Sequence, residues 1–173
     1  MSPRIASLVP SATETLVALG LGGCLVARTG FCIHPADAVG AVPKVGGTKD
    51  VNLAKLKRLA PTHVVVNVDE NRRDTAEALR EFVPQVLVTH PNRPEDNLAL
   101  FEQLRAAFGD QPGVNARAAA LSAACSAALA RCRERSWPGE RVLYLIWRAP
   151  WMTVARDTYI STLLAEVGWH SWP

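Results

Sequence analysis

The stretch from Val114 to Arg135 is the feature that most restricts what this chain can fold into. It is rich in alanine and leucine, the strongest helix formers, and contains neither glycine nor proline. A helix of about 22 residues is about 33 Å long, more than a crossover helix in a compact α/β domain needs. Its apolar residues recur at three- and four-residue steps and so share one face: Ala118, Leu121, Cys125, Ala128, Leu129 and Cys132. We therefore predict one continuous backbone helix over 113–135 that links two α/β units. The alternative is a surface helix that ends a single domain.

The chain before this helix alternates apolar runs with helix-like segments. The runs predict four strands: Arg4–Val9, Leu25–Arg28, His63–Val68 and Gln85–Thr89. Helices are expected over Ala12–Leu19, Val51–Leu59, Asn71–Phe82 and Pro94–Phe108. This order predicts an α/β fold with a mostly parallel, Rossmann-like sheet in a lobe spanning 1–110. His63–Val68, the longest β-branched run, should be the most buried strand. Ser11 and Glu14 fit a capping box with Ser11 as the N-cap.

The chain after the long helix holds fewer elements. We expect a strand over Arg141–Trp147, a short extended return over Trp151–Ala155 and a helix over Tyr159–Val167. These are too few for an independent core, so 141–173 is predicted to be an incomplete second α/β lobe. One face of the strand Arg141–Trp147 should lack a partner. Exposed apolar surface and an open strand edge favour association, so we expect self-association and weak ligand binding.

Composition excludes several functions. The net charge is +3 and the basic residues are scattered, which argues against a nucleic-acid-binding protein. The sequence contains no run of about 18 apolar residues, so no insertion into a membrane is predicted. Met1 leads directly into a strand without a secretory leader, so either the protein stays in the cytoplasm or its leader lies outside this sequence. The four cysteines form no CxxC pair and are expected to be buried free thiols: Cys24, Cys32, Cys125 and Cys132.

The predicted strand ends carry no recognisable set of catalytic groups. Ser11 lacks the GxSxG elbow, and no phosphate-binding GxxxxGK[ST] loop is present. Cys32 and His34 are close in sequence, but a metal would need further ligands from His63 or His90, so no protein-ligated metal is predicted. The rival to a binding protein is a cytoplasmic α/β enzyme with a site near Cys32, His34 and Glu70.

The tryptophans are all in the last quarter of the chain. Trp147, Arg148 and Trp151 fall on one predicted strand-end loop, and this combination suits a flat or anionic ligand. From the residues alone, a place in the sheet core is favoured for Trp147. For Trp151, contact with a ligand and packing on the long helix are equally supported.

Several segments, taken in order, resemble the helical-backbone (class III) substrate-binding proteins of ABC importers, the cobalamin, haem and iron-siderophore receptors. They are RIASLVPSATETLVALGLG, VGGTKDVNLAKLKRLAPTHVVVN, ENRRD, the long helix, and VLYLIWRAPWMTVARDTYISTLLAEVG. The resemblance implies a periplasmic binding protein, not an enzyme, with ligand held between two lobes and docking on an ABC permease. The transported ligand would be a cobalamin, a haem or a ferric siderophore, with no covalently bound cofactor.

Strand ends and resemblance together give one set of candidate ligand-binding residues: Phe31, Thr48, Lys49, Asn67, Glu70, Asn71, Arg72, Trp147, Arg148 and Trp151. The three aromatic residues of this set would form apolar walls. The three basic residues would pair with carboxylates or phosphates on the ligand. Phe31 matches an aromatic position of the cobalamin receptors, whereas Thr48 and Asn67 stand where that branch has tryptophan, which predicts a more polar ligand. Family members also carry a permease-contacting Glu where this chain has Ala54, while Glu14 is present.

Overall fold

A computed structural model describes residues 2–172 of the chain. These residues group into two compact units, one made of Met1–His90 with Leu104–Arg117 and the other of Pro91–Gln103 with Ala118–Pro173. The chain passes between the units through two helices, α5 (Asp96–Phe108) and α6 (Val114–Arg133).

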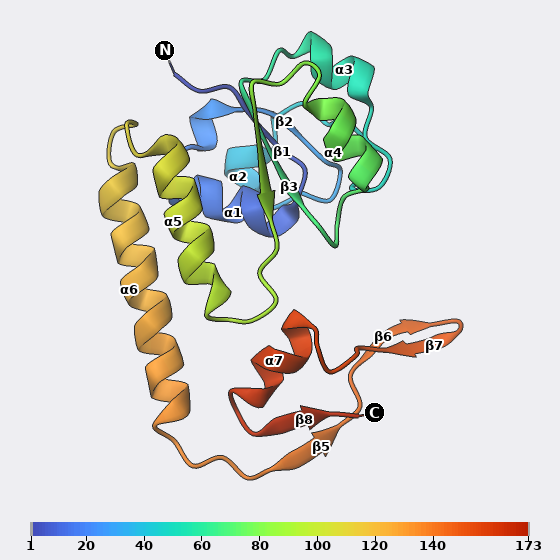
Figure 1. Ribbon diagram of the computed structural model, residues 1–173, viewed down its shortest axis with the longest axis vertical. Helices are drawn as coiled ribbons and strands as arrows, with labels where there is room; N and C mark the ends of the chain where they lie inside the picture. Colours follow the sequence, from blue (N-terminus) through green and yellow to red (C-terminus); the bar gives the residue numbers. More distant parts are fainter. Residues whose placement is uncertain (1, 173) are drawn as a thin grey trace. The chain divides into compact units, whose positions relative to one another are not determined.

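The first unit is built on a four-stranded sheet whose strands are all parallel (Figure 1). The strands are β1 (Ile5–Ser7), β2 (Leu25–Arg28), β3 (His63–Asn67) and β4 (Gln85–Thr89), in the order β2-β1-β3-β4. The helical segments are α1 (Pro10–Ala18), the 3-10 turn η1 (Gly22–Cys24), α2 (Ala36–Val39), α3 (Leu53–Arg58) and α4 (Arg73–Leu79). The predicted parallel α/β sheet is therefore confirmed, and α2 is an addition within the long loop.

The core of this unit follows the alternation of side chains along the strands. Ala6, Leu8, Val64 and Val66 project from one face and pack with Leu56 of α3, Leu79 of α4 and Val83, which follows α4. Every residue of β1 is buried, whereas His63 and Asn67 at the ends of β3 are half-buried. The expectation that β3 would be the most buried strand is therefore wrong. Both strands are interior to the sheet, but the ends of β3 open onto polar loops.

Helix α1 begins earlier than predicted and has no capping box. Its N-cap is Val9, no side chain caps it, and Pro10 occupies its first position, where a missing N–H costs nothing. The Thr13 hydroxyl donates instead to the Val9 carbonyl at 2.9 Å and lies 2.7 Å from the Ser7 hydroxyl. Ser11 is thus a helical residue and not the N-cap, because the helix begins at Pro10 and its N-cap is Val9, two residues before Ser11.

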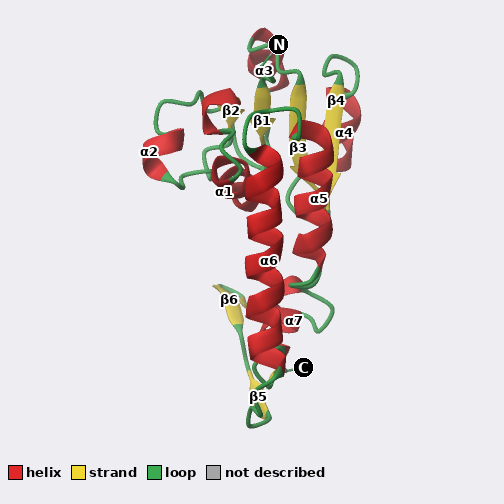
Figure 2. Cartoon of the chain, turned by 90° about the vertical axis from the view of Figure 1, so that its left-hand side faces the viewer, coloured by secondary structure: helices red, strands yellow, loops and turns green. Residues whose placement is uncertain are grey.

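Helix α6 is one unbroken helix of 20 residues (Figure 2), as predicted. Its buried and half-buried positions recur every three or four residues: Val114, Ala118, Leu121, Cys125, Leu129 and Cys132. Ala128, predicted on the same face, is exposed. Within residues 2–172, none of the helices combines the length and apolarity that crossing a membrane requires.

The second unit contains two small strand pairs and a helix. Strands β5 (Glu140–Val142) and β8 (Trp169–Ser171) pair in parallel, and β6 (Leu145–Arg148) and β7 (Trp151–Thr153) form an antiparallel hairpin. Helix α7 (Tyr159–Ala165) is N-capped by Thr158. The predicted single strand Arg141–Trp147 is wrong, because β5 and β6 pair with different partners and the chain changes partner at Leu143 and Tyr144. Strand β8 was not predicted.

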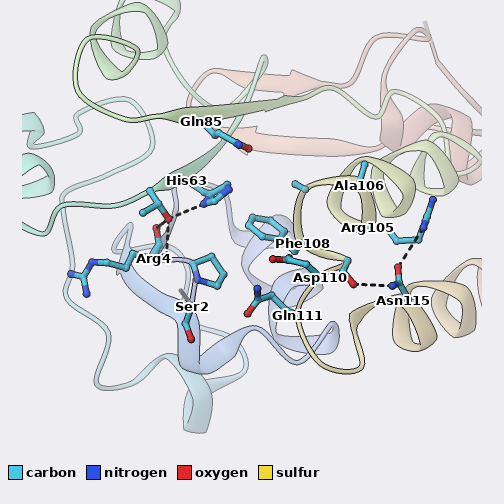
Figure 3. Close-up of a pocket in the computed structure, with 14 residues that line it drawn as sticks. Ser2, Arg4, His63, Gln85, Arg105, Ala106, Phe108, Asp110, Gln111 and Asn115 are labelled. Atoms are coloured by element: carbon cyan, nitrogen blue, oxygen red, sulfur yellow. Dashed lines mark hydrogen bonds between the residues drawn. The ribbon is translucent and has the colours of Figure 1, made fainter.

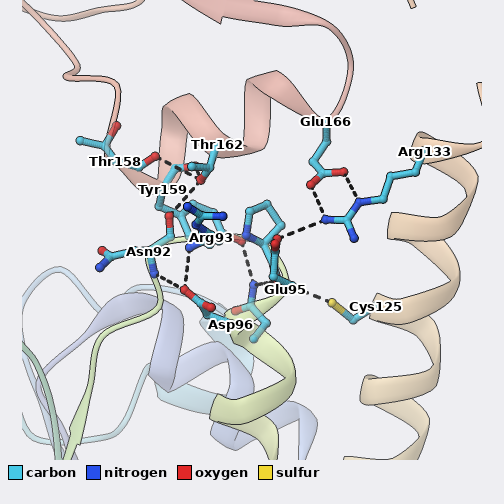
Figure 4. Close-up of polar contacts among 12 residues, drawn as sticks. Asn92, Arg93, Glu95, Asp96, Cys125, Arg133, Thr158, Tyr159, Thr162 and Glu166 are labelled. Carbon is cyan, nitrogen blue, oxygen red and sulfur yellow. Dashed lines mark hydrogen bonds and ion pairs between the residues drawn. The ribbon is translucent and has the colours of Figure 1, made fainter. Parts of the chain in front are cut away.

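An ion-pair network joins α7 to α6 within the second unit (Figure 4). Arg133 forms two hydrogen bonds with the Glu166 carboxylate, of 2.6 and 2.8 Å, and lies 3.3 Å from Glu95. The hydrogen bonds to Glu166 raise the pKa of Arg133 and lower the pKa of the Glu166 carboxyl. Nearby, the Thr162 hydroxyl donates to the Asn92 carbonyl at 2.9 Å. These contacts hold α7 against the segment that precedes α5.

Candidate functional site

The loops that follow the four parallel strands gather at the carboxyl edge of the first sheet. In open parallel sheets, this edge is where ligands bind. The long loop after β2 is well fixed there, because the buried Arg28 side chain donates to the Val39 carbonyl at 2.8 Å and to the Thr29 carbonyl at 3.2 Å. Gly30 N also donates to the Gly46 carbonyl at 2.7 Å, which joins the two ends of that loop.

Asn71 connects three of these loops. Its amide donates to the Leu8 carbonyl at 3.2 Å and to the Thr48 carbonyl at 2.9 Å, and its side-chain oxygen accepts from Asn67 N at 2.9 Å. The residue is only 6% exposed and Thr48 is also buried. Both predicted ligand-binding residues are therefore buried among the loops at this edge of the sheet. Asn71 holds the loops in position, and the Thr48 backbone carbonyl accepts one of its hydrogen bonds.

Asn67 organises the turn after β3. Its side-chain oxygen accepts from Asp69 N at 2.8 Å and from Glu70 N at 3.2 Å. Its amide nitrogen lies 3.5 Å from the Thr89 hydroxyl at the end of β4. Asn67 is half-buried, whereas Glu70 at the tip of the turn is exposed. Of these two predicted residues, Glu70 has the side chain that is accessible to a ligand.

The charges at this edge are more balanced than the sequence pattern suggested. Lys49 Nζ donates to the Asp69 carbonyl at 2.5 Å, and His90 Nε2 lies 3.3 Å from the Asp69 carboxylate. Arg72 forms an ion pair with Asp74 at 2.6 Å. The hydrogen bonds from Arg72 lower the pKa of the Asp74 carboxyl and raise the pKa of Arg72. Lys49 and Arg72 thus already have partners within the unit.

Phe31 is an aromatic side chain that this edge presents to solvent. It is 63% exposed, and Ile33 on the same loop is also exposed. A Cβ atom built on Gly47 would lie 3.4 Å from Phe31 Cε2, so the ring rests against the glycine backbone. Cys32 between them points inward with 0% exposure, and its Sγ lies 3.1 Å from the Thr29 hydroxyl. The loop therefore exposes an aromatic ring on a rigid support.

Replacing Gly47 with valine is expected to displace the Phe31 ring. Alanine would make ordinary van der Waals contact there, but the branched carbons of valine would occupy the space of the ring. Fluorophenylalanine labelling gives four ¹⁹F resonances, and we expect the Phe31 resonance to move in Gly47→Val and to stay in Gly47→Ala. Gly23→Val is the matched control, because no atom lies within 4 Å of a Cβ at Gly23. An unmoved Phe31 resonance in Gly47→Val would contradict the contact.

The predicted residues of the second unit lie on the β6–β7 hairpin. Trp147 is 64% exposed and Trp151 is 67% exposed, and Arg148 between them is exposed as well. The indole of Trp147 donates to the Ala149 carbonyl at 3.1 Å. The interpretation of Trp147 as a core residue is therefore wrong, because its strand pairs only with β7 in a two-stranded hairpin. The packing of Trp151 on the long helix is likewise not formed.

A pocket that the sequence did not indicate lies at the amino edge of the first sheet (Figure 3). It has a volume of about 600 Å³, and its lining includes Arg4, His63, Gln85, Phe108 and Asp110. The His63 ring lies 4.8 Å from the Phe108 ring, and its Nδ1 lies 2.8 Å from the Thr62 hydroxyl. Burial lowers the pKa of His63, which the Asp110 charge and a hydrogen bond with Gln85 partly oppose. Only the packing of α5 against the strand ends creates this environment.

The lowered pKa of His63 predicts that the protein loses stability as the pH falls below about 6.5, the ordinary histidine value. In this range the unfolded chain takes up the proton before the folded chain does, so the free energy of unfolding decreases until the folded pKa is passed. Thermal melts between pH 8 and pH 5 should show a smaller decrease for His63→Gln than for the unchanged protein. His34→Gln, which alters an exposed histidine, is the control. Equal pH slopes for both variants would contradict this assignment.

The described residues do not gather three His, Cys, Asp or Glu side chains around a point where a metal ion could be held. The parallel sheet, its fixed edge loops and the long helix α6 define the class of fold, the α/β fold of helical-backbone binding proteins. Comparison with known proteins identifies the family. Residues 5–172 match the periplasmic binding protein family, and the chain belongs to it.

Two curated relatives illustrate the similarity. The vitamin B12-binding protein of Vibrio vulnificus strain CMCP6 is 29% identical over 165 residues, which cover 95% of this chain and 59% of the relative. That of Vibrio parahaemolyticus is 30% identical over 116 residues, covering 67% of this chain and 42% of the relative. The chain thus spans about three fifths or less of the length of these relatives.

Solved structures share the fold. The periplasmic vitamin B12 binding protein BtuF of Vibrio cholerae superposes with a TM-score of 0.84 at 23% identity, covering 98% of this chain and 65% of that one. The periplasmic haem binding protein HutB of Vibrio cholerae gives a TM-score of 0.82 at 22% identity, covering 99% and 66%. The family resemblance found in the sequence is confirmed by the match of residues 5–172 to the periplasmic binding protein family. Membership of this family argues against the alternative of an enzyme with a site near Cys32, His34 and Glu70, and the Cys32 thiol is fully buried.

Proposed function

We propose that this chain forms part of the substrate-binding component of an ABC importer whose cargo is a metal chelate: a cobalamin, a haem or a ferric siderophore. Its membership of the periplasmic binding protein family and the names of its relatives support the proposal. The observation that carries it is the exposed Phe31 ring, which lies on the carboxyl edge of the sheet and rests on Gly47. A flat macrocycle stacks well on such a ring.

The candidate residues divide into two roles under this proposal. Phe31, Trp147 and Trp151 supply apolar contact area, because all three are exposed aromatic side chains. Lys49, Glu70, Arg72 and Arg148 supply polar contacts to the amide or carboxylate groups at the periphery of the chelate. Asn67, Asn71 and Thr48 keep the edge loops in the shape that presents these groups, and do not themselves reach the ligand.

We further propose that the partner of the chain is an ABC permease. Glu14 on α1 is exposed and available for an ion pair with a permease arginine. Ala54 on α3 is also exposed but carries no charge, so α3 would contribute shape and no ion pair at that position. Docking that depends on Glu14 alone should weaken more steeply with salt than an apolar interface would.

Absorbance titration of the chain with cyanocobalamin, haemin and a ferric hydroxamate siderophore tests the ligand proposal. We expect saturable binding of at least one of them at micromolar concentration. Phe31→Ala should weaken that binding roughly thirtyfold, since truncating a central aromatic anchor costs about 2 kcal/mol. Leu163→Ala, which removes an exposed apolar side chain from α7, should leave the affinity unchanged.

Two results would overturn the proposal. One is the absence of saturable binding for all three chelates. The other is a Phe31→Ala variant that binds as tightly as the unchanged chain.

A further inference from the structure

A basic pocket lies in the second unit, and none of its lining residues is among those proposed to bind the chelate. It has a volume of about 410 Å³ and is lined by Arg141, Arg156, Ser161, Thr162, Ala165, His170, Ser171 and Trp172. These residues come from β5, the loop before α7, α7 itself and the end of β8. The lining thus includes two guanidinium groups, an imidazole and three hydroxyls, and it includes no carboxylate.

The strand pair β5–β8 brings two of the basic residues together. Arg141 and His170 are directly opposed in the parallel register. Trp172 is anchored to the same pair, because its N–H donates to the Val142 carbonyl at 2.9 Å. The Arg141 guanidinium stacks over the Trp172 ring at 4.6 Å. Stacking on the Trp172 ring fixes the orientation of the guanidinium plane, and the N–H groups at the rim of that plane can still donate hydrogen bonds to a ligand.

The hydroxyls form the fixed side of the pocket. Ser161 is buried, and its hydroxyl donates to the Ala155 carbonyl at 2.7 Å. The Ser171 hydroxyl lies 2.7 Å from that of Ser161, which ties the end of β8 to α7. The Ala155–Ser161 hydrogen bond ties the backbone directly before Arg156 to α7. The lining residues of β5, α7 and β8 are therefore held on connected elements, and Arg156 lies on the loop before α7.

The basic groups of this pocket lack anionic partners in the described part of the chain. Within residues 2–172, neither Arg141, Arg156 nor His170 forms an ion pair, in contrast to Arg133 on α6, which contacts two glutamates. Grouping like charges around a pocket raises their mutual repulsion, and an anion in the pocket would relieve it. The paired N–H groups of two guanidinium groups suit the several oxygens of a phosphate better than they suit a spherical monovalent anion.

We propose that this pocket is a binding site for a phosphate group, distinct from the chelate site and independent of the proposed transport function. Arg141 and Arg156 donate to the phosphate oxygens, with Arg141 oriented by Trp172. His170 donates from the neighbouring strand. The phosphate is a terminal monoester, either of a small soluble compound or of a lipid headgroup, since both present the same oxygens.

Isothermal titration of the chain with inorganic phosphate and pyrophosphate in low-salt buffer tests the site. Each of Arg141→Gln and Arg156→Gln should weaken binding roughly tenfold, the effect of one lost charge-assisted hydrogen-bond pair. Arg131→Gln, on the exposed part of α6, is the matched control and should bind as the unchanged chain does. Circular dichroism of Arg141→Gln checks that β5 still forms, and Arg156→Gln tests the site from a loop outside any strand.

Sedimentation with vesicles of phosphatidylcholine containing phosphatidic acid distinguishes the two sources of the phosphate. Vesicle binding that requires Arg141 and is displaced by pyrophosphate indicates a lipid headgroup. Phosphate binding without vesicle binding indicates a soluble phosphate compound. No phosphate binding, or binding that Arg141→Gln and Arg156→Gln leave unchanged, would overturn the proposal whatever the outcome of the chelate titrations.

Discussion

Asn71→Ala is expected to lower the melting temperature of the protein by roughly 10 °C. The substitution removes the hydrogen bonds of Asn71 to the Leu8 and Thr48 carbonyls and to Asn67 N, at about 1 kcal/mol each. For a chain of this size, each kcal/mol shifts the midpoint by about 2–4 °C. The effect is large because the backbone groups left behind lie at a buried position where water cannot readily replace the amide. Calorimetry or thermal circular dichroism measures the shift.

The charged isostere sharpens this test. Asn71→Asp keeps the oxygen that accepts from Asn67 N, but it loses both donated hydrogen bonds and places a carboxylate against two carbonyl oxygens. Its melting temperature should therefore be at least as low as that of Asn71→Ala at pH 7 and recover at pH 4, where the carboxyl can donate a proton. Glu70→Ala, at the exposed neighbouring position, is the control with an expected shift of less than 2 °C. If Asn71→Ala has the same melting temperature as the unchanged protein, Asn71 does not hold the loops.

The chain is expected to self-associate through the β6–β7 hairpin at micromolar concentration. Seven large apolar side chains around this hairpin are exposed: Leu143, Tyr144, Leu145, Ile146, Trp147, Trp151 and Met152. The two strands pair only with each other, so both outer edges offer backbone groups to another strand. Truncating a tryptophan anchor costs about 2 kcal/mol. The double variant Trp147→Ser, Trp151→Ser should therefore raise the protein concentration at which half of the chains are associated by more than about thirtyfold.

Light scattering coupled to size-exclusion chromatography follows this association over a hundredfold range of concentration. Trp137→Ser is the control, since Trp137 is a partly exposed tryptophan outside the hairpin. A monodisperse monomer at every concentration would contradict the expectation. The same result for the double variant and the unchanged chain would place the association elsewhere on the surface.

The four strands of the first unit and the long helix α6 could be predicted from local patterns in the sequence, whereas the strand pairing of the second unit could not. Helix α6 follows from a long stretch without helix-breaking residues, and the ends of β2 and β4 follow from short apolar runs bounded by loop residues. The parallel arrangement follows from the alternation of strands and helices. The position of the candidate site at the carboxyl edge follows in turn from that arrangement. These properties depend on intrinsic propensity and periodicity, which neighbouring residues determine among themselves.

The roles of single residues depended on contacts across the chain. Asn71 could be placed at the edge from the sequence, but its partners are 23 and 63 positions away, so its role in holding the loops could not be predicted. Trp147 has the pattern of a core residue, and only the pairing of β6 with β7 leaves it exposed. The environment of His63 depends on Phe108, which α5 brings to the strand end. Burial and hydrogen-bond partners are properties of the packed chain, and local sequence does not contain them.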